Sequence, residues 1–326
     1  MSKTIRETLV RSLATGGFVS GQTLAEQLGV SRTAIAKHID ALTGMGLDIF
    51  RVQGKGYKLA KPLVLLSKDA INTFLASGKT QTKSIEVHSI IDSTNSYLMR
   101  RISSQISQGE VCVAEYQSAG RGRRGRQWQS PFGSHLYLSM YWRLEQGIAA
   151  AMGLSLVTAL AVSDAIKQLY GLSVQLKWPN DIYLTNRKLA GILIELEGQT
   201  SGPSHSIIGI GLNLNMSAKS AEVIDQPWTD LQSHTRILID RNQLSAVLID
   251  CLQQRLSLYQ EQGLASMVTQ WHNQDIYLNK KVRLVTGDRQ IEGLCRGINN
   301  QGALLLEVSG KVKTIYGGEV SLRGEL

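Results

Sequence analysis

Apolar side chains near the start of the chain recur at helical spacing, which predicts three short helices. The first has an apolar face of Ile5, Leu9 and Leu13 and ends at Gly16-Gly17. Ser20 is placed to cap the second helix, and Gly29 ends it in a tight turn. The third, with Ser31 as its expected cap, has a buried stripe of Ile35, Ile39 and Leu42. Two helices joined by a glycine turn are typical of a helix-turn-helix.

Polar side chains cover the outward face of the third helix, and a β-hairpin is predicted after it. In a helix-turn-helix this helix enters the major groove of DNA with its N-terminal residues nearest the bases. Arg32, Thr33 and Lys37 are therefore predicted DNA contacts. Residues 49–52 and 57–59 flank Gln53-Gly54-Lys55-Gly56, which predicts a wing whose Lys55 contacts phosphate. The alternative is a small three-helix packing module.

The rest of the chain predicts a central α/β module followed by a small β module. Strands are expected at 85–91, 111–116, 134–142, 188–198 and 206–215, and helices at 96–101, 149–170, 243–262 and 265–271. Short strands at 282–285, 290–293, 303–308 and 311–315 predict an SH3-like barrel. We therefore expect an α+β multidomain protein with domains at 1–62, 67–272 and 275–326.

The loop Gly120-Arg121-Gly122-Arg123-Arg124-Gly125-Arg126, here called the arginine loop, joins two of the predicted strands. Its guanidinium groups repel one another, so they must be either solvated, as in an ordinary basic surface loop, or gathered around an anion. The glycines would let the backbone approach that anion closely. The loop also spells G-x-G-x-x-G, but Pro131 and a strand follow where a dinucleotide-binding fold needs a helix. It is no P-loop either, since no G-K-[ST] follows.

Further candidate binding residues lie elsewhere in the central module. Asp92-Ser93-Thr94-Asn95 precedes a helix, where it either only caps the helix or also offers polar groups to a ligand. Lys177 ends an apolar stretch before Trp178-Pro179, and a lysine there is costly unless an anion partners it. Gly209 and Gly211 alternate in a strand and predict a bare groove on one sheet face. Trp228 would either stack on a base or anchor its own loop.

Composition narrows the class of protein. The 326 residues include 35 basic and 26 acidic ones, and the net charge of +9 suits polyanionic partners. Three scattered cysteines and the lack of any signal-like or membrane-spanning apolar run lead us to expect a cytoplasmic protein without a membrane partner. The six histidines lack metal-ligand spacing, so no protein-held metal is expected.

The candidate residues suit a nucleotide bound beside a second, partly apolar ligand. Attack of a carboxylate on the α-phosphate of ATP needs such a set, because cations must offset the repulsion between the two anions. The sequence shows no paired catalytic carboxylates, no Ser/His/Asp set and no nucleophilic cysteine. We therefore expect catalysis by positioning and charge.

At these motifs the chain resembles the bifunctional bacterial biotin–protein ligases that also repress the biotin operon, over essentially its full length. The matching motifs are Asp92 to Asn95, Gln117 to Arg126, Lys177 to Asp181, Ala190 to Glu195 and Gly209 to Asn213, in the family's order. Gln127 is a departure, because close relatives often carry lysine there, and it removes one cation from the loop region.

The resemblance implies a winged helix, a central domain related to class II tRNA synthetases and an SH3-like C-terminal domain. It implies that biotin and MgATP form biotinyl-5′-AMP and pyrophosphate. A lysine of the biotin carboxyl carrier protein of acetyl-CoA carboxylase would then take the biotinyl group. Mg²⁺ would be held mainly by the phosphates. The adenylate would also order the loop and favour a homodimer that binds the biotin operator.

The resemblance also assigns roles to residues. Biotin would contact Ser93, Thr94, Asn95, Gln117, Arg121, Gly122, Arg123, Lys177, Gly209 and Gly211. The nucleotide would contact Arg123, Arg124, Arg126, Asn180, Asn213 and Trp228. Lys177 and Arg123 would be the catalytic residues.

Three other classes of protein fit parts of the pattern. A lipoate ligase would share the central fold, but the arginine loop and the winged helix argue against it. A ligand-sensing repressor without ligase activity would bind DNA and release no pyrophosphate. A nucleotide-dependent dehydrogenase is disfavoured by the missing helix after the glycines.

Overall fold

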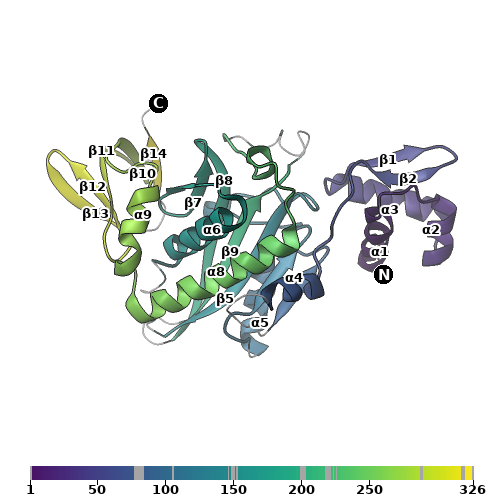
Figure 1. Cartoon of the computed structure of the whole chain (residues 1–326), viewed down its shortest axis with the longest axis horizontal. Helices are drawn as coiled ribbons and strands as arrows, with labels where there is room; N and C mark the ends of the chain where they lie inside the picture. Colours follow the sequence, from purple (N-terminus) through teal and green to yellow (C-terminus); the bar gives the residue numbers. More distant parts are fainter. Residues whose placement is uncertain are drawn as a thin grey trace.

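Three parts of the chain follow one another along the long axis of the molecule (Figure 1). The computed structural model describes residues 2–76, 84–104, 106–145, 147, 151, 153–198, 203–216, 222, 224, 226–286, 289–316 and 320–324. Three short helices and a hairpin form one end, a large sheet with its helices forms the middle, and the C-terminal strands form the other end.

The N-terminal part is the predicted winged helix-turn-helix. It contains α1 (Ser2–Ala14), α2 (Gly21–Leu28), α3 (Arg32–Gly44) and a hairpin of β1 (Ile49–Val52) and β2 (Gly56–Leu59). Ser20 accepts hydrogen bonds from the backbone N–H groups of Gln22 and Thr23, and Gly29 ends α2 with φ +63°. Ser31 accepts from the N–H of Ala34. The caps, the glycine turn and the fully buried stripe of α3 are thus confirmed.

The central part is built on a seven-stranded mixed sheet of order β3-β4-β5-β9-β8-β7-β6. Its strands are β3 (Ile85–His88), β4 (Val111–Ala114), β5 (His135–Leu144), β6 (Gln175–Lys177), β7 (Asp181–Leu184), β8 (Arg187–Gly198) and β9 (Ser204–Asn213). Only β3 and β4 pair in parallel among these strands. The helices α4 (Lys68–Leu75), α6 (Leu154–Tyr170) and α8 (Arg241–Gln262) share the main apolar core with the sheet. The helix α5 (Thr94–Arg101) packs on β4, β5 and β9 through a separate, smaller cluster.

The C-terminal part is a five-stranded antiparallel sheet of order β13-β12-β11-β10-β14. It is preceded by a 3₁₀ turn, η5 (Ala265–Met267), and by α9 (Val268–Gln274). The strands are β10 (Lys281–Thr286), β11 (Arg289–Ile298), β12 (Leu304–Val308), β13 (Lys311–Ile315) and β14 (Val320–Gly324). The sequence pattern did not predict β14, which completes the sheet beside β10.

Several predicted boundaries were wrong. The strand expected over 85–91 ends at His88, because the chain bends at Ser89 and Ile90 before the α5 cap. The helix expected over 149–170 begins at Leu154, and residues 149–150 and 152 of that prediction lie outside the described residues. Most of the polar segment after β9, residues 217–221, 223 and 225, also lies outside them.

Buried polar contacts hold the segment between the winged helix and the central part, and one backbone bond reaches the winged helix itself. Glu115 is 2% exposed and accepts from the N–H of Leu66 (2.5 Å) and from Arg241 Nη1 (2.5 Å). The backbone N–H of Phe132 donates to the carbonyl of Met45 at the end of α3 (2.8 Å), and the Phe132 ring is buried in the winged-helix core. The segment that follows the arginine loop is therefore in direct contact with the C-terminal cap of α3.

Among the described residues, no helix is long and apolar enough to cross a membrane.

Candidate active site

One pocket gathers most of the residues predicted from the motifs. The predicted residues that line it are Ser93, Thr94, Asn95, Gln117, Arg121, Gly122, Arg123, Arg124, Arg126, Lys177, Asn180, Gly209 and Gly211. They come from the start of α5, the arginine loop, the β6–β7 turn and β9. Segments that lie far apart in the sequence thus line one pocket.

A continuous hydrogen-bond network fixes the polar end of this pocket. Gln117 Oε1 accepts from the N–H and the hydroxyl of Thr94 (2.9 and 3.1 Å). The buried Ser139 hydroxyl lies 2.7 Å from Thr94 Oγ1 and donates to Asn95 Oδ1 (2.5 Å). The Asn95 amide in turn donates to Glu195 Oε2 (2.8 Å). Ser93 caps α5 by accepting from the N–H of Ser96 (3.4 Å), so this stretch both caps the helix and lines the pocket.

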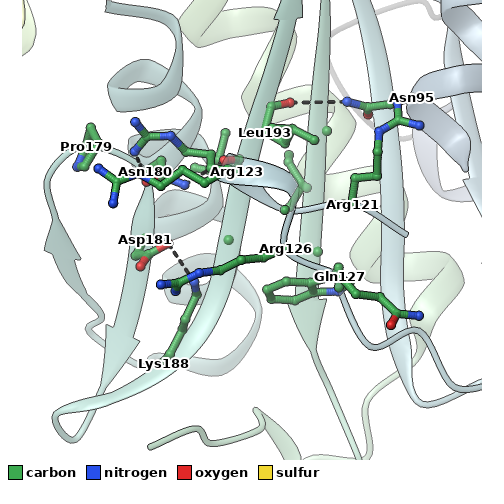
Figure 2. Close-up of a pocket in the computed structure, with 18 of the residues that line it drawn as sticks. Asn95, Arg121, Arg123, Arg126, Gln127, Pro179, Asn180, Asp181, Lys188 and Leu193 are labelled. Carbon is green, nitrogen blue, oxygen red and sulfur yellow. Dashed lines mark hydrogen bonds and ion pairs between the residues drawn. The ribbon is translucent and has the colours of Figure 1, made fainter. Parts of the chain in front are cut away.

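The arginine loop reaches two walls of the pocket. Arg121 pairs with Glu195 (2.9 Å), whereas Arg123 Nη1 donates to Asn180 Oδ1 (2.8 Å). Figure 2 shows the two side chains extending from the loop in opposite directions. The loop closes tightly, since the N–H of Gly122 donates to the carbonyl of Arg126 (2.7 Å). Burial, and then the charge of Arg124, lower the pKa of the Arg123 guanidinium. Both effects disfavour its charged form, so a bound anion would stabilise the charged guanidinium.

The bare groove predicted over the strand glycines is filled by two side chains. A Cβ atom at Gly211 would lie 2.5 Å from the Trp128 ring, and one at Gly191 would lie 3.1 Å from it. A Cβ atom at Gly209 would lie 2.2 Å from Asn95 Oδ1. The prediction of a bare groove was therefore wrong for this structure, in which the Asn95 and Trp128 side chains occupy the space over the two glycines. Trp128 was not among the predicted site residues, although it lies only two residues after the arginine loop.

Asn213 and Trp228 do not line the main pocket. They line a neighbouring one, which shares Arg126, Trp128 and Lys188 with it. Asn213 is buried and its amide donates to the carbonyl of Thr229 (3.0 Å). The backbone of the Trp228 segment pairs with Lys188, so this tryptophan is held at the rim by its own strand contact.

Two lysines face the pocket from opposite ends of the β6–β8 region. Lys177 Nζ donates to the Tyr183 hydroxyl (3.2 Å) and lies over the Tyr183 and Tyr277 rings. Lys188 Nζ pairs with Asp181 (2.9 Å) and lies over the Trp128 ring. The sequence did not single out Lys188, because its pattern predicted only a buried strand over 188–198. No local signal marks Asp181, its partner across the β7–β8 turn.

No cysteine is among the described residues that line this pocket. All three cysteines are buried, and burial raises the pKa of the Cys251 thiol to about 11 and that of Cys295 to about 12. A thiolate is therefore disfavoured. The described residues also contain no group of three or more His, Cys, Asp or Glu side chains able to hold a metal ion. Such a site can bind, orient and neutralise anions.

A cation-rich pocket at a glycine-lined sheet, attached to a winged helix, defines a ligase of the biotin and lipoate type with a DNA-binding domain. Family models agree. Residues 5–58 match an HTH domain, residues 87–213 the biotin/lipoate A/B protein ligase family, and residues 277–323 the biotin protein ligase C-terminal domain.

Similar proteins cover nearly the whole chain. The bifunctional ligase/repressor BirA of Salmonella typhimurium is 49% identical and that of Escherichia coli 48%, each over 98% of both chains. The solved biotin protein ligase of Aquifex aeolicus in complex with biotin and ATP is 29% identical, with a TM-score of 0.64. It covers 74% of this chain and 100% of that one. The chain belongs to the family of the bifunctional ligase/repressor BirA.

Proposed function

We propose that this chain joins biotin to the AMP moiety of ATP, with release of pyrophosphate, and transfers the biotinyl group to a lysine of the biotin carboxyl carrier protein of acetyl-CoA carboxylase. One observation carries the proposal: the arginine loop and the Lys177 segment line a single pocket. Cations thus flank the space where two anions must meet. Membership of the BirA family and the biotin- and ATP-bound structure of the Aquifex aeolicus ligase support this assignment.

In the first step a biotin carboxylate oxygen attacks the α-phosphorus of ATP. The bond to the bridging oxygen breaks, and pyrophosphate leaves with the electron pair. Lys177 and Arg123 would neutralise the reacting carboxylate and phosphate, while Thr94, Asn95 and Gln117 hold biotin through the network described above. Arg124, Arg126 and Asn180 would contact the nucleotide, and Asn213 and Trp228 would extend that contact into the neighbouring pocket.

In the second step the acceptor lysine amine attacks the acyl carbonyl of biotinyl-5′-AMP, and AMP leaves. Mg²⁺ would arrive with ATP and be held mainly by the phosphates. The residues that line the pocket agree with this, because Asp181 is the one carboxylate among the described lining residues and is already paired with Lys188.

The winged helix supports a second activity, repression of the biotin operon. Arg32, Thr33 and Lys37 on α3 and Lys55 on the wing are all exposed, as DNA contacts must be. We infer that biotinyl-5′-AMP acts as the corepressor by favouring a homodimer that matches a two-fold symmetric operator.

Two experiments test these activities. The purified chain, biotin and MgATP should add one biotinyl mass to an isolated carrier-protein domain, and Lys177→Ala should lower that rate by orders of magnitude. Near-normal transfer by this variant would remove Lys177 from the mechanism. Operator binding should strengthen, and sedimentation should show a dimer, when biotin and MgATP are added together. An operator affinity indifferent to both would refute the corepressor role.

A further inference from the structure

Lys177 is held by aromatic rings from two different parts of the chain. Its Nζ atom lies 5.1 Å from the centre of the Tyr183 ring on β7 and 5.8 Å from that of Tyr277, which follows α9. An ammonium over an aromatic face is attracted by the negative potential of the ring, and more strongly where water is partly excluded. Lys177 lines the pocket, whereas neither tyrosine is among its lining residues.

The position of Tyr277 is fixed by backbone contacts with the strand that carries Lys177. The N–H of Ile276 donates to the carbonyl of Leu176 (2.9 Å), and Asp275 bridges to Leu176, which brings the backbone next to Tyr277 alongside the end of β6. The N–H of Tyr277 donates to Asp275 Oδ1 (2.9 Å). The ring also packs against the main apolar core. Tyr277 is therefore held firmly enough to orient another side chain.

The C-terminal part also anchors the other side of the same turn. The indole Nε1 of Trp178 donates to the carbonyl of Gly302 (3.0 Å), and Trp178 is 2% exposed. The Lys177-Trp178-Pro179 segment thus lies between two contacts from residues beyond 274, one on each side of the lysine.

We propose that Tyr277 is a positioning residue for the adenylation step. Its ring, together with the Tyr183 hydroxyl and ring, holds the Lys177 ammonium and directs it into the pocket. This inference rests on the proposed ligase function. It means that the C-terminal part contributes to the first half-reaction through one aromatic ring.

The test compares three variants of the full-length chain in biotin-dependent ATP–pyrophosphate exchange. Tyr277→Leu removes the ring and should lower kcat by about 5- to 30-fold, the range expected for a cation–π contact in a half-buried site, with little change in the KM for biotin. Tyr277→Phe keeps the ring and should restore wild-type kcat. Tyr316→Leu removes an exposed tyrosine of the same part and should have no effect.

Each outcome decides the point. Wild-type kcat in Tyr277→Leu would overturn the inference, and so would an equal loss in Tyr277→Phe, because the aromatic face would then not be the cause. If Tyr277→Leu does not fold, Tyr277→Met replaces it, since it fills similar space without an aromatic face. If the wild-type chain catalyses biotin-dependent exchange and Tyr277→Leu has the same kcat, only this inference is refuted and the proposed function stands. Absence of biotin-dependent exchange in the wild-type chain removes the proposed function and this inference with it.

Discussion

Replacing Gly209 by alanine would place a methyl group against the Asn95 side chain. The new Cβ would lie 2.2 Å from Asn95 Oδ1, and an ordinary contact needs at least about 3.4 Å. Asn95 must therefore move by roughly 1.2 Å, the difference between these two distances. It is 4% exposed and bonded to Ser139 (2.5 Å) and Glu195 (2.8 Å), so it cannot move without losing these partners.

The size of the effect follows from those two hydrogen bonds. A neutral bond contributes about 0.5–1.5 kcal/mol and one to a charged group about 1.5–3 kcal/mol. Their loss should lower the free energy of unfolding of Gly209→Ala by about 2–4 kcal/mol. Because Asn95 is also a proposed biotin contact, biotin should bind at least about tenfold more weakly, which corresponds to the loss of roughly one ligand hydrogen bond.

The assay combines urea unfolding, followed by tryptophan fluorescence, with calorimetric titration of biotin. Gly17→Ala is the matched control, because a Cβ there meets nothing within 4 Å, and it should leave both quantities unchanged. Unfolding energy and biotin affinity in Gly209→Ala equal to those of the wild type would refute the reasoning.

Three other predictions concern stability and DNA. Glu115→Gln leaves the buried Arg241 without its counter-charge and should lower the free energy of unfolding by about 3–5 kcal/mol. A decrease below about 1 kcal/mol would show that this ion pair does not stabilise the segment around Leu66. Burial lowers the pKa of His135 to about 3, so the unfolded chain binds more protons below pH 6.5. The free energy of unfolding should then fall by up to about 1.4 kcal/mol per pH unit as the pH drops toward 3. An unchanged acid dependence in His135→Asn would contradict this. Lys55→Ala should weaken operator binding and reduce its salt slope by about one while leaving ligation intact, and lost ligation would contradict the separation of functions.

Local sequence signals predicted the winged helix well. Ser20, Gly29 and Ser31 act within a few residues of their own positions, so their roles follow from spacing alone. The glycines of β9 also marked a place where another group packs closely on the strand, because the lack of a Cβ can be read from the sequence. The sequence did not show which group fills that space.

What the sequence did not predict depends on contacts between distant residues. Glu195 lies 74 positions from Arg121 and 100 from Asn95, and no spacing rule joins them. Trp128 gave no sign that it would cover Gly211. Lys177 was expected to need an anion, yet Tyr183 and Tyr277 also stabilise its charge, and the second of these belongs to a segment whose pattern indicated only a β module.

ATP–pyrophosphate exchange by the purified chain tests the central claim most directly. With MgATP and labelled pyrophosphate, exchange should require biotin, and it should be absent when biotin is omitted or replaced by lipoate. Because exchange reports only the reversible formation of an acyl-adenylate, neither the carrier protein nor DNA is needed. Biotin-dependent exchange would establish the adenylation step at this pocket. No exchange, in a chain that still binds operator DNA, would contradict the account and leave a ligand-sensing repressor.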